Sequence, residues 1–316
     1  MVSSATKNDV RLMAQRVWLL VGAFAVTVAA AYLGVGLRPD LSSNPALLAI
    51  IAIYAGIAIF YRTVRADPRL YASLEAAGQM VLVLLLGLML TYAAACSPLP
   101  ARDALFDSLD HAMGLDRSAY FAAIVDSDLL CKLSGYIYLT IQPQIVLVPF
   151  ALLMTGHGRR LQTFTLAFGM ALMTTIVVGA LLPSSASHVF ADLHAAGFDT
   201  SGSHFATYEA LRGGTRRVVA LNKFEGLITF PSFHAAAGVL FTWALWVVRP
   251  LRWPLLVVNA AMVVVAPIHG PHYFVDIPAG LVVASAAILV ARRLARIPAA
   301  TPASLPQVAA PQPSRA

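Results

Sequence analysis

The sequence predicts an all-α fold, a polytopic membrane bundle of about eight transmembrane helices. Hydrophobic residues make up 59% of the 316 residues and charged residues only 12%, whereas soluble domains carry about 25% charged residues. The mean hydropathy is +0.75. Apolar runs near the length that crosses about 30 Å of hydrocarbon recur along almost the whole chain. Together these observations exclude an ordinary soluble domain.

The membrane spans are predicted from apolar runs that Arg, Pro or Gly bound. The predicted spans are Val17 to Leu37, Pro45 to Tyr61, Leu74 to Cys96, Leu133 to Met154, Leu161 to Leu182, Leu227 to Val248, Trp253 to Ile268 and Phe274 to Leu294. The first run is long and ends at no clear small-residue cleavage site, so we expect it to be retained. The tail, residues 297–316, is rich in Ala, Pro, Ser and Gln, a composition that predicts disorder.

Basic residues predict the orientation, because Lys and Arg accumulate in cytoplasmic loops. They occur before the first span and after the second, fourth, sixth and eighth: Lys7, Arg11, Arg16; Arg62, Arg65, Arg69; Arg159, Arg160; Arg249, Arg252; Arg292, Arg293, Arg296. Both termini are therefore expected in the cytoplasm, with the protein in the plasma (inner) membrane. This pattern accounts for the net charge of +7 without a nucleic-acid partner.

Two long connections, Ser97 to Lys132 and Pro183 to Gly226, are then expected outside. In the first, Leu105 and Leu109 recur at helical spacing beside several Asp residues, which predicts a helix along the outer interface. Cys96 and Cys131 both lie at outer ends of spans, so a disulfide between them stays open. Their spacing fits neither a zinc site nor a redox motif.

Two polar clusters lie at the outer membrane face, where ionisable side chains are costly and therefore functional candidates. The segment FPSFH ends at His234, near the outer end of the sixth span. The segment HGPHYFVD ends at Asp276, at the outer start of the eighth span. The loop-charge argument uses neither segment, so their shared face supports the orientation independently.

The spacing of these residues predicts acid, base and nucleophile chemistry. His272 and Asp276 are four residues apart and share one face of a helix. The carboxylate can orient the imidazole and leave its other nitrogen free as a nucleophile or base. His234 supplies a second imidazole, which can donate a proton to a leaving group. The set suits phosphoryl transfer through a phosphohistidine.

FPSFHA and GPHYFVDIPAG resemble the two histidine motifs of the type 2 phosphatidic acid phosphatase superfamily, in the branch that contains inositol phosphorylceramide synthases. The resemblance implies a six-helix catalytic core, here residues 74–296, to which residues 1–73 add a cytoplasmic N-terminus and two helices. It implies that His272 is the nucleophile, Asp276 its orienting partner, His234 the general acid and Ser232 a phosphate contact. No cofactor or metal is implied.

The phosphate's cationic partners are expected from elsewhere, because two basic features of the superfamily are absent. There is no Lys, six residues, then Arg-Pro, and Ala266 stands where an Arg would precede the nucleophile by six residues. The outer loop before the sixth span offers LRGGTRR. We expect Arg212 to bind the phosphate, with Lys223 second. A solvated basic loop facing anionic lipid is the alternative.

Three alternatives stay open at this stage. His269, His272 and Asp276 are ordinary zinc ligands, which fits a metal-dependent membrane hydrolase. A non-enzymatic transporter would use the polar cluster to line its path. The segment Gln142 to Gln144 either bends the fourth span or lines a substrate cavity. No role is assigned to the remaining candidates: His188, His194, His204.

We therefore expect a membrane lipid phosphatase or phosphotransferase that acts on a lipid phosphate, phosphodiester or pyrophosphate at the extracytoplasmic face. Water as acceptor makes it a phosphatase, whereas an alcohol makes it a transferase of the inositol phosphorylceramide synthase type. The same phosphohistidine serves both reactions. The sequence therefore leaves the acceptor, the lipid and the oligomeric state open.

Overall fold

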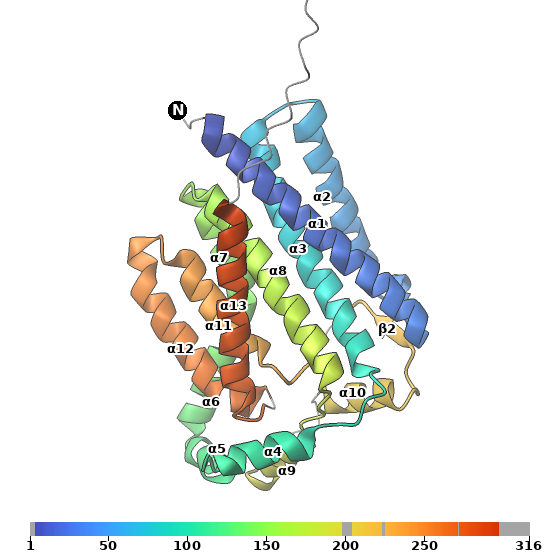
Figure 1. Cartoon of the computed structure of the whole chain (residues 1–316), viewed down its shortest axis with the longest axis vertical. Helices are drawn as coiled ribbons and strands as arrows, with labels where there is room; N and C mark the ends of the chain where they lie inside the picture. The colour runs from blue at the N-terminus through green and yellow to red at the C-terminus, as the bar shows by residue number, and fades with distance from the viewer. Residues whose placement is uncertain (1–3, 198–203, 223–224, 271, 297–316) are drawn as a thin grey trace, which may run out of the picture.

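A computed structural model describes residues 4–197, 204–222, 225–270 and 272–296. Long helices run roughly alongside one another and form a bundle, which confirms the predicted all-α membrane fold (Figure 1). The helices that are long and apolar enough to cross a membrane are α1 (Ser4–Val35), α2 (Pro45–Thr63), α3 (Pro68–Ala95), α8 (Gly158–Leu181), α12 (Arg252–His269) and α13 (Asp276–Arg296). The bundle holds one extended apolar core, as expected for packed helices.

Two of the eight predicted spans differ from a single full-length helix. The fourth is divided into α6 (Asp128–Leu139) and α7 (Ile141–Met154), which meet at 42°. The sixth is α11 (Phe233–Leu245), which is shorter than the other spans. By length and composition, the described residues thus contain six spanning helices, or seven if α6 and α7 together make one.

The bend between α6 and α7 lies beside the segment Gln142 to Gln144. Pro143 stands in the first turn of α7, where a missing N–H group is tolerated. Gln144 is buried, and its Nε2 lies 3.4 Å from Oγ1 of Thr140 at the junction. The polar residues of this segment therefore accompany a break in the span.

The late start of α11 has a local cause. Proline at position 231 disfavours the helical conformation for the preceding Phe230. The Ser232 hydroxyl accepts a hydrogen bond from the N–H of Ala235 at 3.3 Å and so caps the helix. The segment before Phe233 is therefore not helical, and His234 lies in the first turn of α11.

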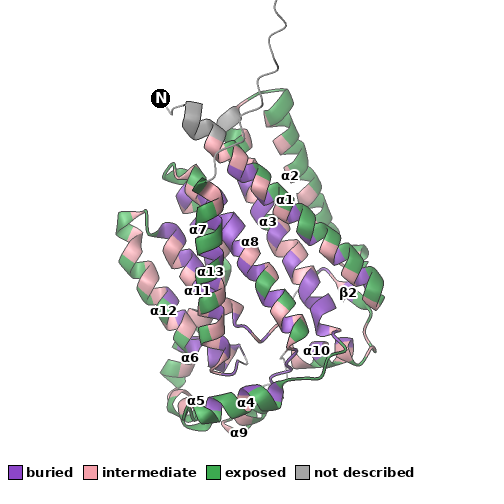
Figure 2. Cartoon of the chain, viewed as in Figure 1, coloured by how far each residue is buried: buried purple, intermediate pink, exposed green. Residues whose placement is uncertain are grey.

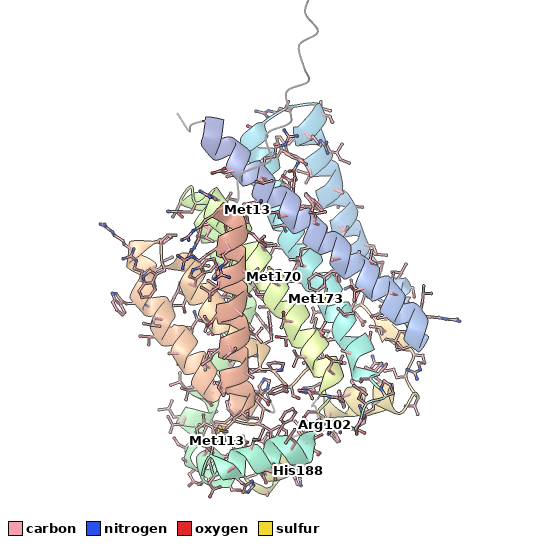
Figure 3. All side chains as sticks on the ribbon, viewed as in Figure 1. Met13, Arg102, Met113, Met170, Met173 and His188 are labelled. Carbon is pink, nitrogen blue, oxygen red and sulfur yellow. The ribbon has the colours of Figure 1, made fainter. Side chains whose placement is uncertain are left out.

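Four short helices lie across one end of the bundle and form what we name the cap layer: α4 (Asp103–Ala112), α5 (Arg117–Val125), α9 (Ser187–Ala195) and α10 (Phe205–Arg212) (Figure 1). In α4, Leu105 and Leu109 are exposed while Asp103 and Asp110 are buried. The predicted helix is thus present, with its acidic side against the protein. Arg102 and His188 lie at this end, and Met13 lies toward the other (Figure 3).

The N-terminal helices join the bundle to different extents. Met13, Val17 and Phe24 of α1 are buried in the main core, whereas α2 has no buried residue (Figure 2). Beyond α1, β1 (Arg38–Asp40) pairs in parallel with β2 (Val218–Ala220). The division into residues 1–73 and 74–296 stays a prediction, and the expected disordered tail lies outside the described residues. Two 3-10 helices complete the elements: η1 (Leu41–Ser43) and η2 (Arg249–Leu251).

The disulfide left open by the sequence is not formed. Cys96 and Cys131 are both free thiols. The sulfur of Cys96 instead lies 3.3 Å from Nη1 of Arg217. The cysteines therefore make no covalent link between the ends of α3 and α6.

Candidate active site

The N-terminal ends of α11 and α13 lie against each other at the end of the bundle that the cap layer covers (Figure 1). The N–H of Ser232 donates to the carbonyl of Asp276 at 3.0 Å. Gly280 makes this approach possible, because a Cβ at that position would lie only 2.2 Å from the carbonyl oxygen of Ser232. The two histidine segments thus meet in space, although about 40 residues separate them in the chain.

His272 and Asp276 are in direct contact. Nδ1 of His272 lies 3.0 Å from Oδ2 of Asp276, and both side chains are buried. The helix α13 begins only at Asp276, so His272 lies in the preceding turn and not on the helix itself. The same carboxylate oxygen accepts the N–H of Tyr273 at 3.1 Å. The predicted four-residue relationship is therefore made through a turn.

The second nitrogen of His272 lies 3.2 Å from the Ser232 hydroxyl. Oδ2 of Asp276 already accepts the N–H of Tyr273, so it also accepts from Nδ1 of His272, and the neutral ring keeps a lone pair on Nε2. Ser232 can then donate to that lone pair while its oxygen caps α11. Burial lowers the pKa of His272 to about 4, an effect that a hydrogen bond with the Thr229 backbone partly opposes.

His234 lies beside His272, with ring centroids 6.4 Å apart and ring planes at 65°. Its other neighbour is Tyr138 of α6, stacked at a centroid distance of 4.1 Å and an interplanar angle of 17°. This stacking fixes the plane of the His234 ring. No sequence signal pointed to Tyr138, because an aromatic residue in an apolar span usually packs against other helices or lipid.

His269 is turned toward a different partner. Its Nε2 lies 2.7 Å from the Ser134 hydroxyl of α6. Within the described parts of the chain, no group of three or more His, Cys, Asp or Glu side chains is arranged to hold a metal ion. The donor set of the metal alternative, His269 with His272 and Asp276, is therefore not assembled in this structure.

The predicted phosphate-binding cations lie in the connection before α11, where each described arginine has local partners. Arg212 donates from Nη1 to the carbonyl of Ser97 at 2.9 Å and from Nη2 to the carbonyl of Leu99. Arg216 contacts Val218 and Thr207, and Arg217 contacts Cys96. Lys223 lies outside the described residues. Among the described residues, the hydrogen bonds of Arg212 do not reach Ser232, His234 or His272.

Two histidines that received no role also have neighbours near this end. His188 of α9 lies with Nδ1 3.4 Å from Oδ2 of Asp107. His204 packs edge-to-face against Phe190. Burial first, and the neighbouring His272 second, lower the pKa of His204 to about 4. The protonated forms of His204 and His272 therefore disfavour each other, which the sequence context of His204 did not indicate.

Comparisons with curated proteins and with solved structures find no match to this chain. A family model does match it, over residues 104–290, and that range includes both histidine segments. The match covers more than half of the chain. It supports a phosphatase-type activity on lipid phosphates, and we conclude that this protein belongs to the PAP2 superfamily.

Proposed function

We propose that this protein is a membrane lipid phosphatase or phosphotransferase that works through a phosphohistidine on His272. The observation that carries the proposal is the pair of contacts on that ring. Asp276 accepts from Nδ1, Nε2 lies beside the Ser232 hydroxyl, and the His234 ring lies 6.4 Å from the His272 ring, centroid to centroid. One nitrogen is thus held and the other is left as a nucleophile.

In the first half-reaction, Nε2 of His272 attacks phosphorus and the bond to the leaving oxygen breaks. His234 gives that oxygen a proton, so the product leaves as an alcohol or as a phosphate group. Asp276 stabilises the positive charge that develops on the phosphorylated imidazole. In the second half-reaction, His234 takes a proton from water or from an alcohol. The activated oxygen attacks phosphorus, and the N–P bond breaks.

The phosphate brings nearly two negative charges at neutral pH, so the site needs positive potential. The N-terminal ends of α11 and α13 both lie here and contribute partial positive charge. Arg212 and Lys223 are the proposed cationic contacts. A guanidinium has five N–H groups, and the two described contacts of Arg212 leave others for a phosphate. Ser232 is the proposed hydroxyl contact.

The proposed location of the site is the extracytoplasmic face of the plasma (inner) membrane, with both termini in the cytoplasm. Loop charges support this orientation. The helix arrangement agrees with it, because the N-terminal ends of α11 and α13 lie at the end of the bundle that carries the cap layer (Figure 1), whereas Met13 lies toward the other end (Figure 3). A lipid phosphate could then enter from the outer leaflet, where its head group meets the site.

The test is an assay of the purified protein on a panel of lipid phosphates, phosphodiesters and pyrophosphates, with and without polyol acceptors. Release of phosphate identifies a phosphatase, whereas a new phosphodiester in the presence of inositol identifies a transferase. We expect turnover to survive EDTA, because the nucleophile needs no divalent ion. Loss of activity in EDTA with recovery in zinc would favour the metal-dependent hydrolase. No turnover on any panel member would favour the transporter.

A further inference from the structure

The turn between His272 and Asp276 is held by carboxylates at three successive N–H groups. The N–H of Tyr273 donates to Oδ2 of Asp276 at 3.1 Å. The N–H of Phe274 donates to Oδ2 of Asp110 at 2.9 Å, and the N–H of Val275 donates to Oδ1 of Asp110 at 3.0 Å. Asp110 therefore uses both oxygens on the backbone that carries the histidine pair.

A distant element therefore holds the turn that leads into α13. The N–H groups of this turn precede the helix and have no partners within it, so they need acceptors from elsewhere. Here the acceptor is Asp110 of α4, which is 164 residues from Phe274 in the chain and fully buried. Asp103 lies about two turns before Asp110 on the same face of α4 and accepts the Tyr273 hydroxyl at 3.0 Å. The cap layer thus contacts the turn through two aspartates: Asp110 binds the backbone and Asp103 binds the Tyr273 side chain.

Arg117 compensates the buried charge of Asp110, which would be costly without a partner. Its Nη1 lies 2.9 Å from Oδ2 of Asp110, and its Nε lies 2.9 Å from Oδ2 of Asp192. Nη2 contacts Asp107. The guanidinium carbon also lies 5.3 Å from the centroid of the Tyr273 ring. Arg117 is itself nearly buried, so Asp110 is held in one position from both sides.

We infer that Asp110, backed by Arg117, is a positioning residue for the reaction. It fixes the turn from Tyr273 to Val275 so that Nε2 of His272 points at the substrate phosphate. This inference rests on the proposed function. A misplacement of about 1 Å at a reacting group costs about 10²-fold in rate, so a loosened turn should slow the chemical step more than it weakens binding.

The test compares Asp110→Asn with the wild type in kinetics and in amide hydrogen exchange. The amide keeps the shape of the side chain, but it replaces one acceptor oxygen by a donor that faces a backbone N–H or Arg117. We expect kcat to fall about 10²-fold with KM changed by less than about threefold. Exchange at the N–H groups of Phe274 and Val275 should become faster.

Asp126→Asn is the matched control, because Asp126 is an exposed aspartate at the end of α5 in the same layer. Its kinetics and its exchange pattern should stay those of the wild type. A normal kcat in Asp110→Asn, or an equal fall in kcat in Asp126→Asn, overturns the inference. Should Asp110→Asn fail to fold, Arg117→Lys is the second variant. It keeps the positive charge, but a lysine cannot reproduce the three guanidinium contacts with Asp107, Asp110 and Asp192. That variant should also lose kcat, and an unchanged kcat overturns the inference too.

The assay of His272→Ala separates this inference from the proposed function. If His272→Ala is inactive and Asp110→Asn is fully active, the turn needs no help from α4 and only the positioning role fails. If His272→Ala retains the activity of the wild type, the phosphohistidine reaction itself fails, and the positioning role fails with it.

Discussion

Nδ1 of His272 lies 3.0 Å from Oδ2 of Asp276, in a site where both side chains are buried. The contact sets the tautomer of the ring, and in the proposed reaction the carboxylate supplies the negative charge that a phosphorylated imidazole requires. Asp276→Asn keeps the shape and removes that charge. We expect kcat to fall by about 10³- to 10⁴-fold, as for other carboxylates that orient a catalytic histidine. The change in kcat is measured by steady-state kinetics of the protein in detergent or nanodiscs. A fall of less than tenfold would contradict the orienting role.

The position of His234 beside His272 predicts that its importance depends on the leaving group. An alkyl oxygen leaves poorly without a proton, whereas a nitrophenolate leaves well without one. We expect His234→Ala to lose about 10²- to 10⁴-fold in kcat on a lipid phosphate and much less on a nitrophenyl phosphate. His272→Ala should lose both activities. Equal losses on the two substrates in His234→Ala would argue against proton donation.

A buried His272 predicts an unusual pH dependence. Burial lowers the pKa of His272 to about 4, against about 6.5 for an exposed histidine. Above its pKa the imidazole is neutral and can act as the nucleophile, so lowering the pH from 7 to 5 should leave the nucleophile intact. We expect the acid limb of kcat/KM to lie well below pH 6, after correction for the ionisation of the substrate. A limb at the pKa of an exposed histidine would contradict this prediction.

Arg212 is the proposed phosphate contact, and its two carbonyl contacts make a careful control necessary. Lysine cannot reproduce a bidentate grip on phosphate oxygens. We expect Arg212→Lys to raise KM for the lipid phosphate about tenfold or more, with the melting temperature almost unchanged. The control is Arg159→Lys, because Arg159 lies in the first turn of α8, at the opposite end of the helix bundle. This variant should leave kcat and KM unchanged.

A different result for Arg212→Lys would reassign the residue. A lower melting temperature with normal KM and kcat would mean that Arg212 only ties α10 to the carbonyls of Ser97 and Leu99. The phosphate contact would then pass to Lys223 or to the arginines at positions 216 and 217.

Local signals in the sequence predicted much of the fold and part of the site. Apolar runs located the helices, because hydrocarbon thickness fixes their length. The four-residue spacing predicted the contact between His272 and Asp276, which the structure contains. Proline at position 231 also carries a local signal, which the predicted span from Leu227 to Val248 ignores. That span therefore begins earlier than α11, which starts at Phe233.

The remaining parts of the site depend on contacts between distant residues. Tyr138 stacks on His234 across about 100 positions, and Asp110 reaches Phe274 across 164. No periodicity links such pairs, because each lies in a segment with its own local pattern. In α4 the spacing of Leu105 and Leu109 predicts an interfacial helix but not that Asp103 and Asp110 are buried. The burial of Asp110 is explained by Arg117 and by the N–H groups of the turn before α13, which only the structure brings together.

The central claim is that His272 becomes phosphorylated, and trapping the intermediate tests it most directly. A radiolabelled lipid phosphate is mixed with the enzyme, the reaction is stopped in base within one turnover, and the labelled peptide is sequenced by mass spectrometry. Phosphohistidine is stable in base and labile in acid, unlike phosphoserine. We expect label on His272 in the wild type, more of it in Asp110→Asn if breakdown is the slower step, and none in His272→Ala. Label on another residue, or an active enzyme with no label on His272 at any time, would contradict the account.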